Sequence, residues 1–230
     1  MIRLTQLKLV AAAIAVVIGA GGLIAVNQLF AKPGDPKPAP ATAPAASKAA
    51  SSTPKQAMKD FAAAVRTGDA SQLAALSVAE TDDEKDLVRA ATAYVEATGA
   101  FSNAVADKFG ADAKKELSTL FELTPVGRFA LLIEMSIDQA PEQIDGNFAS
   151  IQPPGIEDLT FWLQNVNGQW KLATGRMCEH WTPDNWRERI GLMNMAAQGL
   201  QHMTEGVATG KYASFAELKR DLANIVRQNR

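Results

Sequence analysis

The sequence predicts an α+β protein, in which a small antiparallel sheet of 3-4 strands packs against several helices, preceded by one N-terminal hydrophobic helix. Three observations support this fold class. Apolar residues recur at helical spacing over residues 82–109. After Pro141 the spacing changes to alternation, and Asn167-Gly168 separates two alternating runs. At the other end of the chain, residues 9–26 contain no polar side chain.

The N-terminal segment, residues 1–31, predicts a transmembrane or signal-anchor helix. Arg3 and Lys8 precede the apolar run, which as a helix would rise about 27 Å, close to the ~30 Å hydrocarbon core of a bilayer. We expect residues 9–30 to anchor the chain in the cell membrane as a single span, with the C-terminal domain outside the cytoplasm. Two alternatives remain open: a signal cleaved near Ala31, which gives a secreted or periplasmic protein, and a buried helix of a soluble core.

Residues 32–55 predict a disordered linker, and residues 56–230 predict one extracytoplasmic α+β domain. The linker contains six prolines and no large apolar residue, so it cannot bury enough surface to become ordered. From Gln56 onward the chain has 17 basic and 24 acidic residues. This acidic body without a long basic run argues against nucleic acid as a partner. The single cysteine, Cys178, excludes a disulfide within the chain.

Residues typical of helix starts and helix ends predict three helices in the first part of the domain. Pro54 is suited to a first helical position, and Gly68 ends that helix before Asp69 caps a short second one. A long third helix begins at Asp82 or the residue after it and ends at Gly110.

The next stretch is less clear. A shorter helix through Leu117 and Phe121 ends before Pro125. Residues 126–139 are apolar enough for a helix or a buried strand, and we favour a helix.

Turn signals predict the strands and the helices that close the domain. Asp145-Gly146 indicates a two-residue hairpin turn, and Asn167-Gly168 favours a type I′ turn because both residues tolerate positive φ. Two helices follow. Residues 182–184 open the first of them. Ser214 and Glu217 form the pattern of a capping box for the second.

The densest group of reactive side chains is Cys178, Glu179 and His180. On a strand, Cys178 and His180 would share one side, which suits a nucleophile–base pair or part of a metal site. No orienting group or oxyanion donor can be assigned, and a buried structural cysteine is the expected role. We therefore assign no catalytic, cofactor-binding or metal-binding residue and expect no cofactor.

Other polar groups are expected to be structural. His202 and Glu205 have the spacing used in di-metal bundles, but the sequence has no second pair. The acids at the start of the long helix predict a solvated helix start rather than a calcium loop. These acids are Asp82, Asp83, Glu84 and Asp86.

Four tryptophans lie within 25 residues of one another: Trp162, Trp170, Trp181 and Trp186. We expect them to belong to the core. If two of them were exposed, they would form a binding surface instead.

The stretches 60-DFAAAVRTGDASQLAAL-76, 144-IDGNFASI-151 and 161-FWLQNVNGQWKL-172 resemble the nuclear transport factor 2-like superfamily, over about a quarter of the chain. The resemblance implies a curved sheet with a pocket between it and the helices. The long third helix and the two last helices depart from that pattern, so no ligand residue is transferred. The order of anchor, linker and domain also resembles exported or membrane-anchored bacterial proteins.

The sequence therefore predicts a membrane-tethered extracytoplasmic binding or interaction module. The alternative is an enzyme of unrecognised type that uses a pocket near Cys178 and His180.

Overall fold

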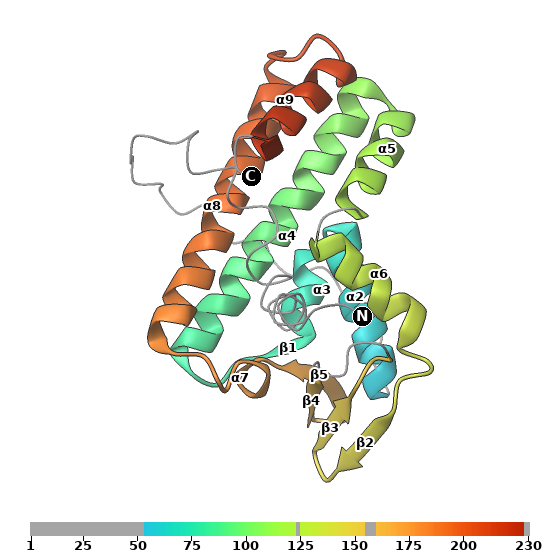
Figure 1. The fold of residues 1–230 in the computed structure, drawn as a ribbon, viewed down its shortest axis with the longest axis vertical. Helices are drawn as coiled ribbons and strands as arrows, with labels where there is room; N and C mark the ends of the chain where they lie inside the picture. The colour runs from blue at the N-terminus through green and yellow to red at the C-terminus, as the bar shows by residue number, and fades with distance from the viewer. Residues whose placement is uncertain (1–52, 123–124, 155–159, 228–230) are drawn as a thin grey trace.

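The computed structural model describes residues 53–122, 125–154 and 160–227. The expected membrane segment at residues 1–31 and almost all of the expected linker lie outside these ranges. Within them, no helix combines the length and the apolar character needed to cross a membrane. The described residues form an α+β fold of eight helices and one open, five-stranded sheet (Figure 1).

The sheet has the strand order β1-β5-β4-β3-β2 and is mixed. Strands β2 to β5 are antiparallel neighbours, whereas β1 runs parallel to β5, with Ser77 opposite Leu172. The expectation of 3-4 antiparallel strands is therefore wrong at this edge. Strand β1 has only two residues, which is too short for an alternating apolar pattern to be recognised in the sequence. Its partner β5 lies far along the chain. The strands are β1 (Ser77–Val78), β2 (Glu142–Asp145), β3 (Phe148–Ile151), β4 (Phe161–Val166) and β5 (Gln169–Ala173).

The sequence predicts the position of one hairpin turn correctly and that of the other one residue too early. Asn167 and Gly168 have φ values of 56° and 81°, as a type I′ turn requires, so the predicted β4–β5 turn is confirmed. The Asn165 side-chain oxygen also accepts a hydrogen bond from the Gly168 N–H at 2.9 Å. The β2–β3 turn lies one residue later than expected, because Asp145 pairs with Phe148 and is still part of the strand.

The sheet has two different faces. The face that packs against α2 is called the inner face, and its side chains belong to the main core. The opposite, outer face is half-buried. The register places Ala149, Ile151, Phe161, Leu163, Trp170 and Leu172 on the inner face and Phe148, Ser150, Trp162, Gln164 and Lys171 on the outer face.

Local sequence signals explain most helix ends. Pro54 is the first residue of α2, and the Thr53 hydroxyl accepts a hydrogen bond from the Gln56 N–H at 3.2 Å. The helix favoured for residues 126–139 is confirmed as α6, whereas α7 was not expected. The helices are α2 (Pro54–Thr67), α3 (Ala70–Ala75), α4 (Asp82–Phe109), α5 (Ala111–Glu122), α6 (Pro125–Ser136), α7 (Thr174–Met177), α8 (Pro183–Ala208) and α9 (Phe215–Arg227).

The long helices α4 and α8 lie side by side and run in the same direction, from the sheet toward the far end of the molecule (Figure 1). They join two hydrophobic clusters. The first lies around the sheet, α2 and α6, and includes Leu87 and Met193. The second lies between the far ends of α4 and α8, α5 and α9, and includes Phe101 and Met203.

Candidate functional site

Cys178 and His180 are close in sequence but lie in different environments. Cys178 is 3% exposed and belongs to the first hydrophobic cluster, whereas Glu179 and His180 are exposed. The strand geometry considered for them is wrong, because they form a turn after α7. The Trp181 N–H donates a hydrogen bond to the Cys178 carbonyl oxygen at 2.9 Å and closes that turn. The structure therefore does not bring the thiol and the imidazole together as a nucleophile–base pair.

The carboxylate of Glu84 is near enough to the Cys178 thiol to act on its pKa. Glu84 is only 9% exposed, so the expectation that every acid at the start of α4 is solvated is wrong for this residue. One of its carboxylate oxygens accepts a hydrogen bond from the Glu80 N–H at 2.7 Å. A Cβ atom on Gly175 would lie 2.5 Å from the other oxygen, so the lack of a side chain there makes room for the carboxylate.

This environment keeps the Cys178 thiol from acting as a nucleophile. Burial, reinforced by the negative charge of Glu84, raises the pKa of Cys178 to about 12. The thiolate is the reactive form of cysteine, and at neutral pH Cys178 remains protonated. Its place in the fold agrees with the buried structural role expected from the sequence.

The pair His202 and Glu205 does not form a metal centre with other described residues. Both side chains are exposed on α8. Within the described ranges, no group of three or more histidine, cysteine, aspartate or glutamate side chains is arranged to hold a metal ion.

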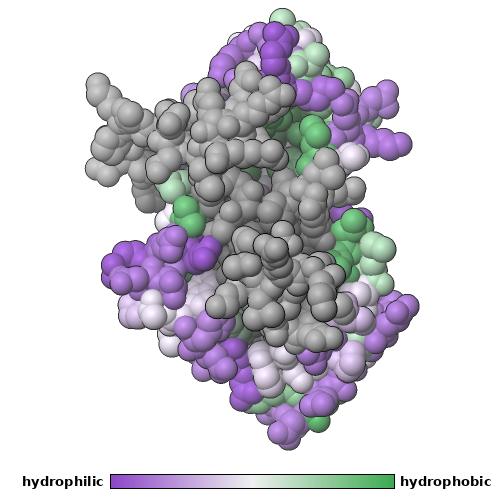
Figure 2. Space-filling model, in the orientation of Figure 1, coloured by the Kyte–Doolittle hydropathy of each residue, from purple (hydrophilic) through white to green (hydrophobic). Residues whose placement is uncertain are grey.

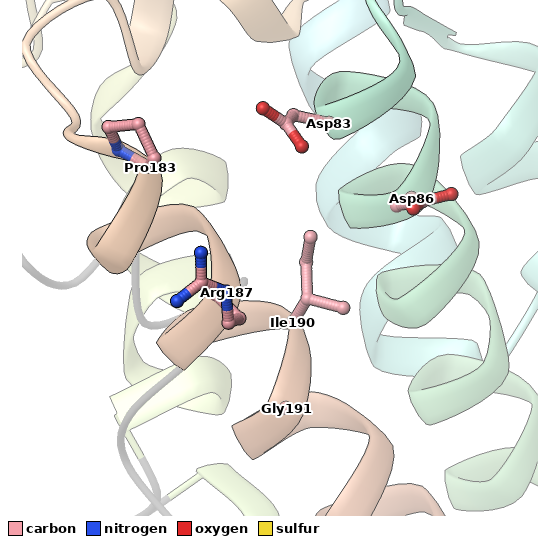
Figure 3. A pocket seen from close by; sticks show the side chains of 6 residues that line it. All are labelled: Asp83, Asp86, Pro183, Arg187, Ile190 and Gly191. Carbon is pink, nitrogen blue, oxygen red and sulfur yellow. The ribbon is translucent and has the colours of Figure 1, made fainter.

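A cleft of about 360 Å³ lies between the first turns of α4 and α8 (Figure 3). Its charges are largely balanced within each helix, since Arg89 pairs with Asp86 at 2.7 Å and Arg187 pairs with Asp184 at 3.1 Å. In Figure 3 the Asp83 carboxylate faces across the cleft toward α8. The cleft is lined by Asp83, Asp86, Pro183, Arg187, Ile190 and Gly191.

The four tryptophans do not share one environment. Trp170 is 7% exposed and belongs to the core, as expected. Trp181 and Trp186 are half-buried and pack edge to face, with ring centroids 5.1 Å apart. Trp162 is half-buried on the outer face of the sheet, where the Arg176 guanidinium lies 5.1 Å from its ring centroid.

Helix α6 carries an apolar surface that the sequence did not single out. Leu131 is 37% exposed and Met135 is 73% exposed, and their spacing of four residues places them on the same side of the helix. Ile133 and Ile137, the latter just after the helix, are fully buried instead. Figure 2 shows hydrophobic surface at the position of α6 in Figure 1. This surface could not be predicted from the sequence, because residues 126–139 are apolar on more than one side of a helix.

Comparisons with protein-family models, curated proteins and solved structures find no match for this chain. The resemblance to the nuclear transport factor 2-like superfamily stays a prediction.

Proposed function

We propose that this chain is a membrane-tethered interaction module whose α+β domain lies outside the cytoplasm. The apolar segment 9–30 and the proline-rich linker support the tether. The observation that carries the interaction role is the apolar face of α6, formed by Leu131 and Met135.

This face lies close to the point where the linker joins the domain. The Lys55 ammonium donates a hydrogen bond to the Asp138 carbonyl oxygen at 3.0 Å. The Lys59 ammonium pairs with the Asp138 carboxylate at 2.6 Å. The start of α2 is therefore held beside the turn that follows α6, and Met135 precedes Asp138 by three residues.

The physical chemistry of this face suits a protein partner. Large apolar side chains that remain together at the surface mark interaction sites, and a methionine adapts to partners of different shape. The buried Ile133 packs α6 against the core, while Leu131 and Met135 remain at the surface. Leu120 on the neighbouring α5 is a further exposed large apolar side chain, at 39%.

The test is site-specific photo-crosslinking of the full chain in cells. A photoreactive residue is placed at Met135 or, as the control, at Gln201, which is exposed on α8. We expect the chain to sediment with membranes and resist carbonate extraction. The Met135 probe should give a discrete adduct that the Gln201 probe does not, and Leu131→Ser should weaken that adduct.

Two results would overturn the proposal. Recovery of the intact chain in the cytosolic fraction would contradict the membrane tether. Identical adducts from both probe positions would contradict the interaction role of the α6 face. The alternative of an enzyme near Cys178 and His180 has no observation in its favour, because the thiol is buried and protonated.

A further inference from the structure

We infer that the outer face of the sheet binds an acidic peptide segment of a protein partner, through the side chains of Arg176 and Lys171. This site is separate from the α6 face. It depends only on the folded domain and not on the membrane anchor.

Two aromatic rings hold Arg176 in place. Its guanidinium carbon lies 3.8 Å from the ring centroid of Phe148 and 5.1 Å from that of Trp162. A guanidinium stacked on a ring keeps its N–H groups, which lie in its own plane, free for hydrogen bonds. Both rings are half-buried while Arg176 is exposed. The arginine is therefore partly immobilised with its donors open to solvent, which lowers the entropy lost when a carboxylate binds.

Arg176 also lacks a carboxylate partner. Arg66, Arg89 and Arg187 each form an ion pair, with Glu134, Asp86 and Asp184 respectively. Arg176 forms no ion pair with any residue that the structure describes. In a domain with more acidic than basic residues, this leaves a cation available for an external anion.

The register supplies a second cation on the same face. Phe148 lies opposite Gln164, and Gln164 lies opposite Lys171 on β5. Neighbouring strands are about 4.8 Å apart, so the Phe148 and Lys171 positions are separated by about 10 Å. Lys171 likewise forms no ion pair within the described ranges.

This separation favours two carboxylates over one phosphate. In an extended peptide, side chains at i and i+2 point the same way and lie about 7 Å apart. Carboxylates on such side chains can each reach one cation, and the Gln164 amide between them offers a further donor. The ligand that fits is therefore an extended segment with acidic residues at alternate positions.

Two acidic side chains near Arg176 predict which substitution should strengthen peptide binding. Asp145 lies opposite Phe148 on the neighbouring strand β2, and Glu179 follows Arg176 by three residues and is exposed. Neither pairs with Arg176, but both lower the positive potential of the face. Removing the charge of Asp145 should therefore strengthen peptide binding.

The experiment measures binding to the full chain in uncharged detergent micelles. The probe is a labelled, end-blocked Gly-Glu-Gly-Glu-Gly peptide, followed by fluorescence anisotropy at low salt. We expect this peptide to bind at least tenfold tighter than the peptide with glutamine in place of glutamate. Arg176→Gln should weaken binding about tenfold, Lys171→Gln three- to tenfold, and Asp145→Asn should tighten it two- to fivefold. Arg89→Gln, on the exposed side of α4, is the matched control and should leave binding unchanged.

Several outcomes would overturn the inference. Equal affinity for the glutamate and glutamine peptides would exclude charge recognition. Equal losses in Arg176→Gln and Arg89→Gln would show a general charge effect. Competition by inorganic phosphate as strong as that of the peptide would assign the face to phosphate groups. If Arg176→Gln fails to fold, Lys171→Gln and Asp145→Asn must still change affinity in opposite directions, or the site is wrong.

Discussion

The Cys178 thiol is buried within the electrostatic reach of the Glu84 carboxylate, and both groups depend on the short helix α7. Gly175 in α7 leaves space for the Glu84 side chain, and Cys178 follows α7 into the core. A buried thiol next to a negative charge resists ionisation, because the thiolate would lose hydration and be repelled. A residue that would be a candidate nucleophile in an open pocket is inert in this position.

This predicts a pH-dependent stability difference. An unfolded cysteine has a pKa of about 8.5, whereas the pKa of folded Cys178 is raised to about 12. The folded state therefore binds more protons between these values, so its contribution to stability is present below pH ~8.5 and is lost as the pH rises toward 12. In urea titrations, Cys178→Ala should lose less stability than the native chain between pH 8 and 10.5. Tyr94 and Tyr212 also have raised pKa values, so some decline remains in both proteins.

Alkylation provides the direct measurement. At pH 9, iodoacetamide should modify Cys178 at least 100-fold more slowly in the folded chain than in urea, because the buried thiol is both protonated and inaccessible. A folded thiol that reacts as fast as the unfolded one would contradict this account.

At the scale of elements, the contact between the end of α2 and the middle of α4 depends on two glycines. Gly68 ends α2 with φ at 76°, a conformation that glycine adopts without strain. Gly99 lies in the middle of α4, and a Cβ atom there would lie 2.9 Å from the Gly68 carbonyl oxygen and 3.2 Å from its Cα. The two backbones are in direct contact, so no side chain fits between them.

Paired substitutions of helical glycines test this contact. Gly191 lies in α8, where an added Cβ would meet nothing within 4 Å. Gly191→Ala should stabilise the protein by about 1 kcal/mol through helix propensity alone. Gly99→Ala gains the same propensity but must push the Gly68 backbone away from α4, and should destabilise the protein by a net ~1–3 kcal/mol. Urea unfolding measures both. A shift in the same direction for both variants would show that the Gly68–Gly99 contact is not tight.

The elements that the sequence predicted are those specified by neighbouring residues. Helix α4 follows from its apolar spacing, and the β4–β5 turn follows from Asn167-Gly168. Strand β1, the burial of Glu84 and the position of Arg176 on Phe148 were not predicted, because each depends on residues brought together by the tertiary fold. Local patterns do not contain that information, which is why the candidate binding faces emerged only from the structure.

At the scale of the molecule, α4 and α8 connect two hydrophobic clusters through a region of small side chains. Ala97 on α4 and Ala196 and Ala197 on α8 are buried but belong to neither cluster. Small residues let two helices approach closely and bury little apolar surface. The described part of the domain therefore buries its large apolar side chains in two separate clusters, and we expect that one end can open before the other.

Hydrogen exchange on matched leucine variants tests this arrangement. Leu218 on α9 and Leu163 on β4 are both fully buried, one in each cluster, and replacing either by alanine should cost about 2–5 kcal/mol. Leu218→Ala should accelerate amide exchange in α5, α9 and the C-terminal halves of α4 and α8, while the β3, β4 and β5 amides keep their protection. Leu163→Ala should instead accelerate exchange in the sheet and α2. The cause is the same in both variants. Each cavity destabilises the cluster in which it lies, and the alanine residues between the clusters couple that destabilisation only weakly to the other cluster. If each variant accelerated exchange uniformly over the domain, the two clusters would be one cooperative unit.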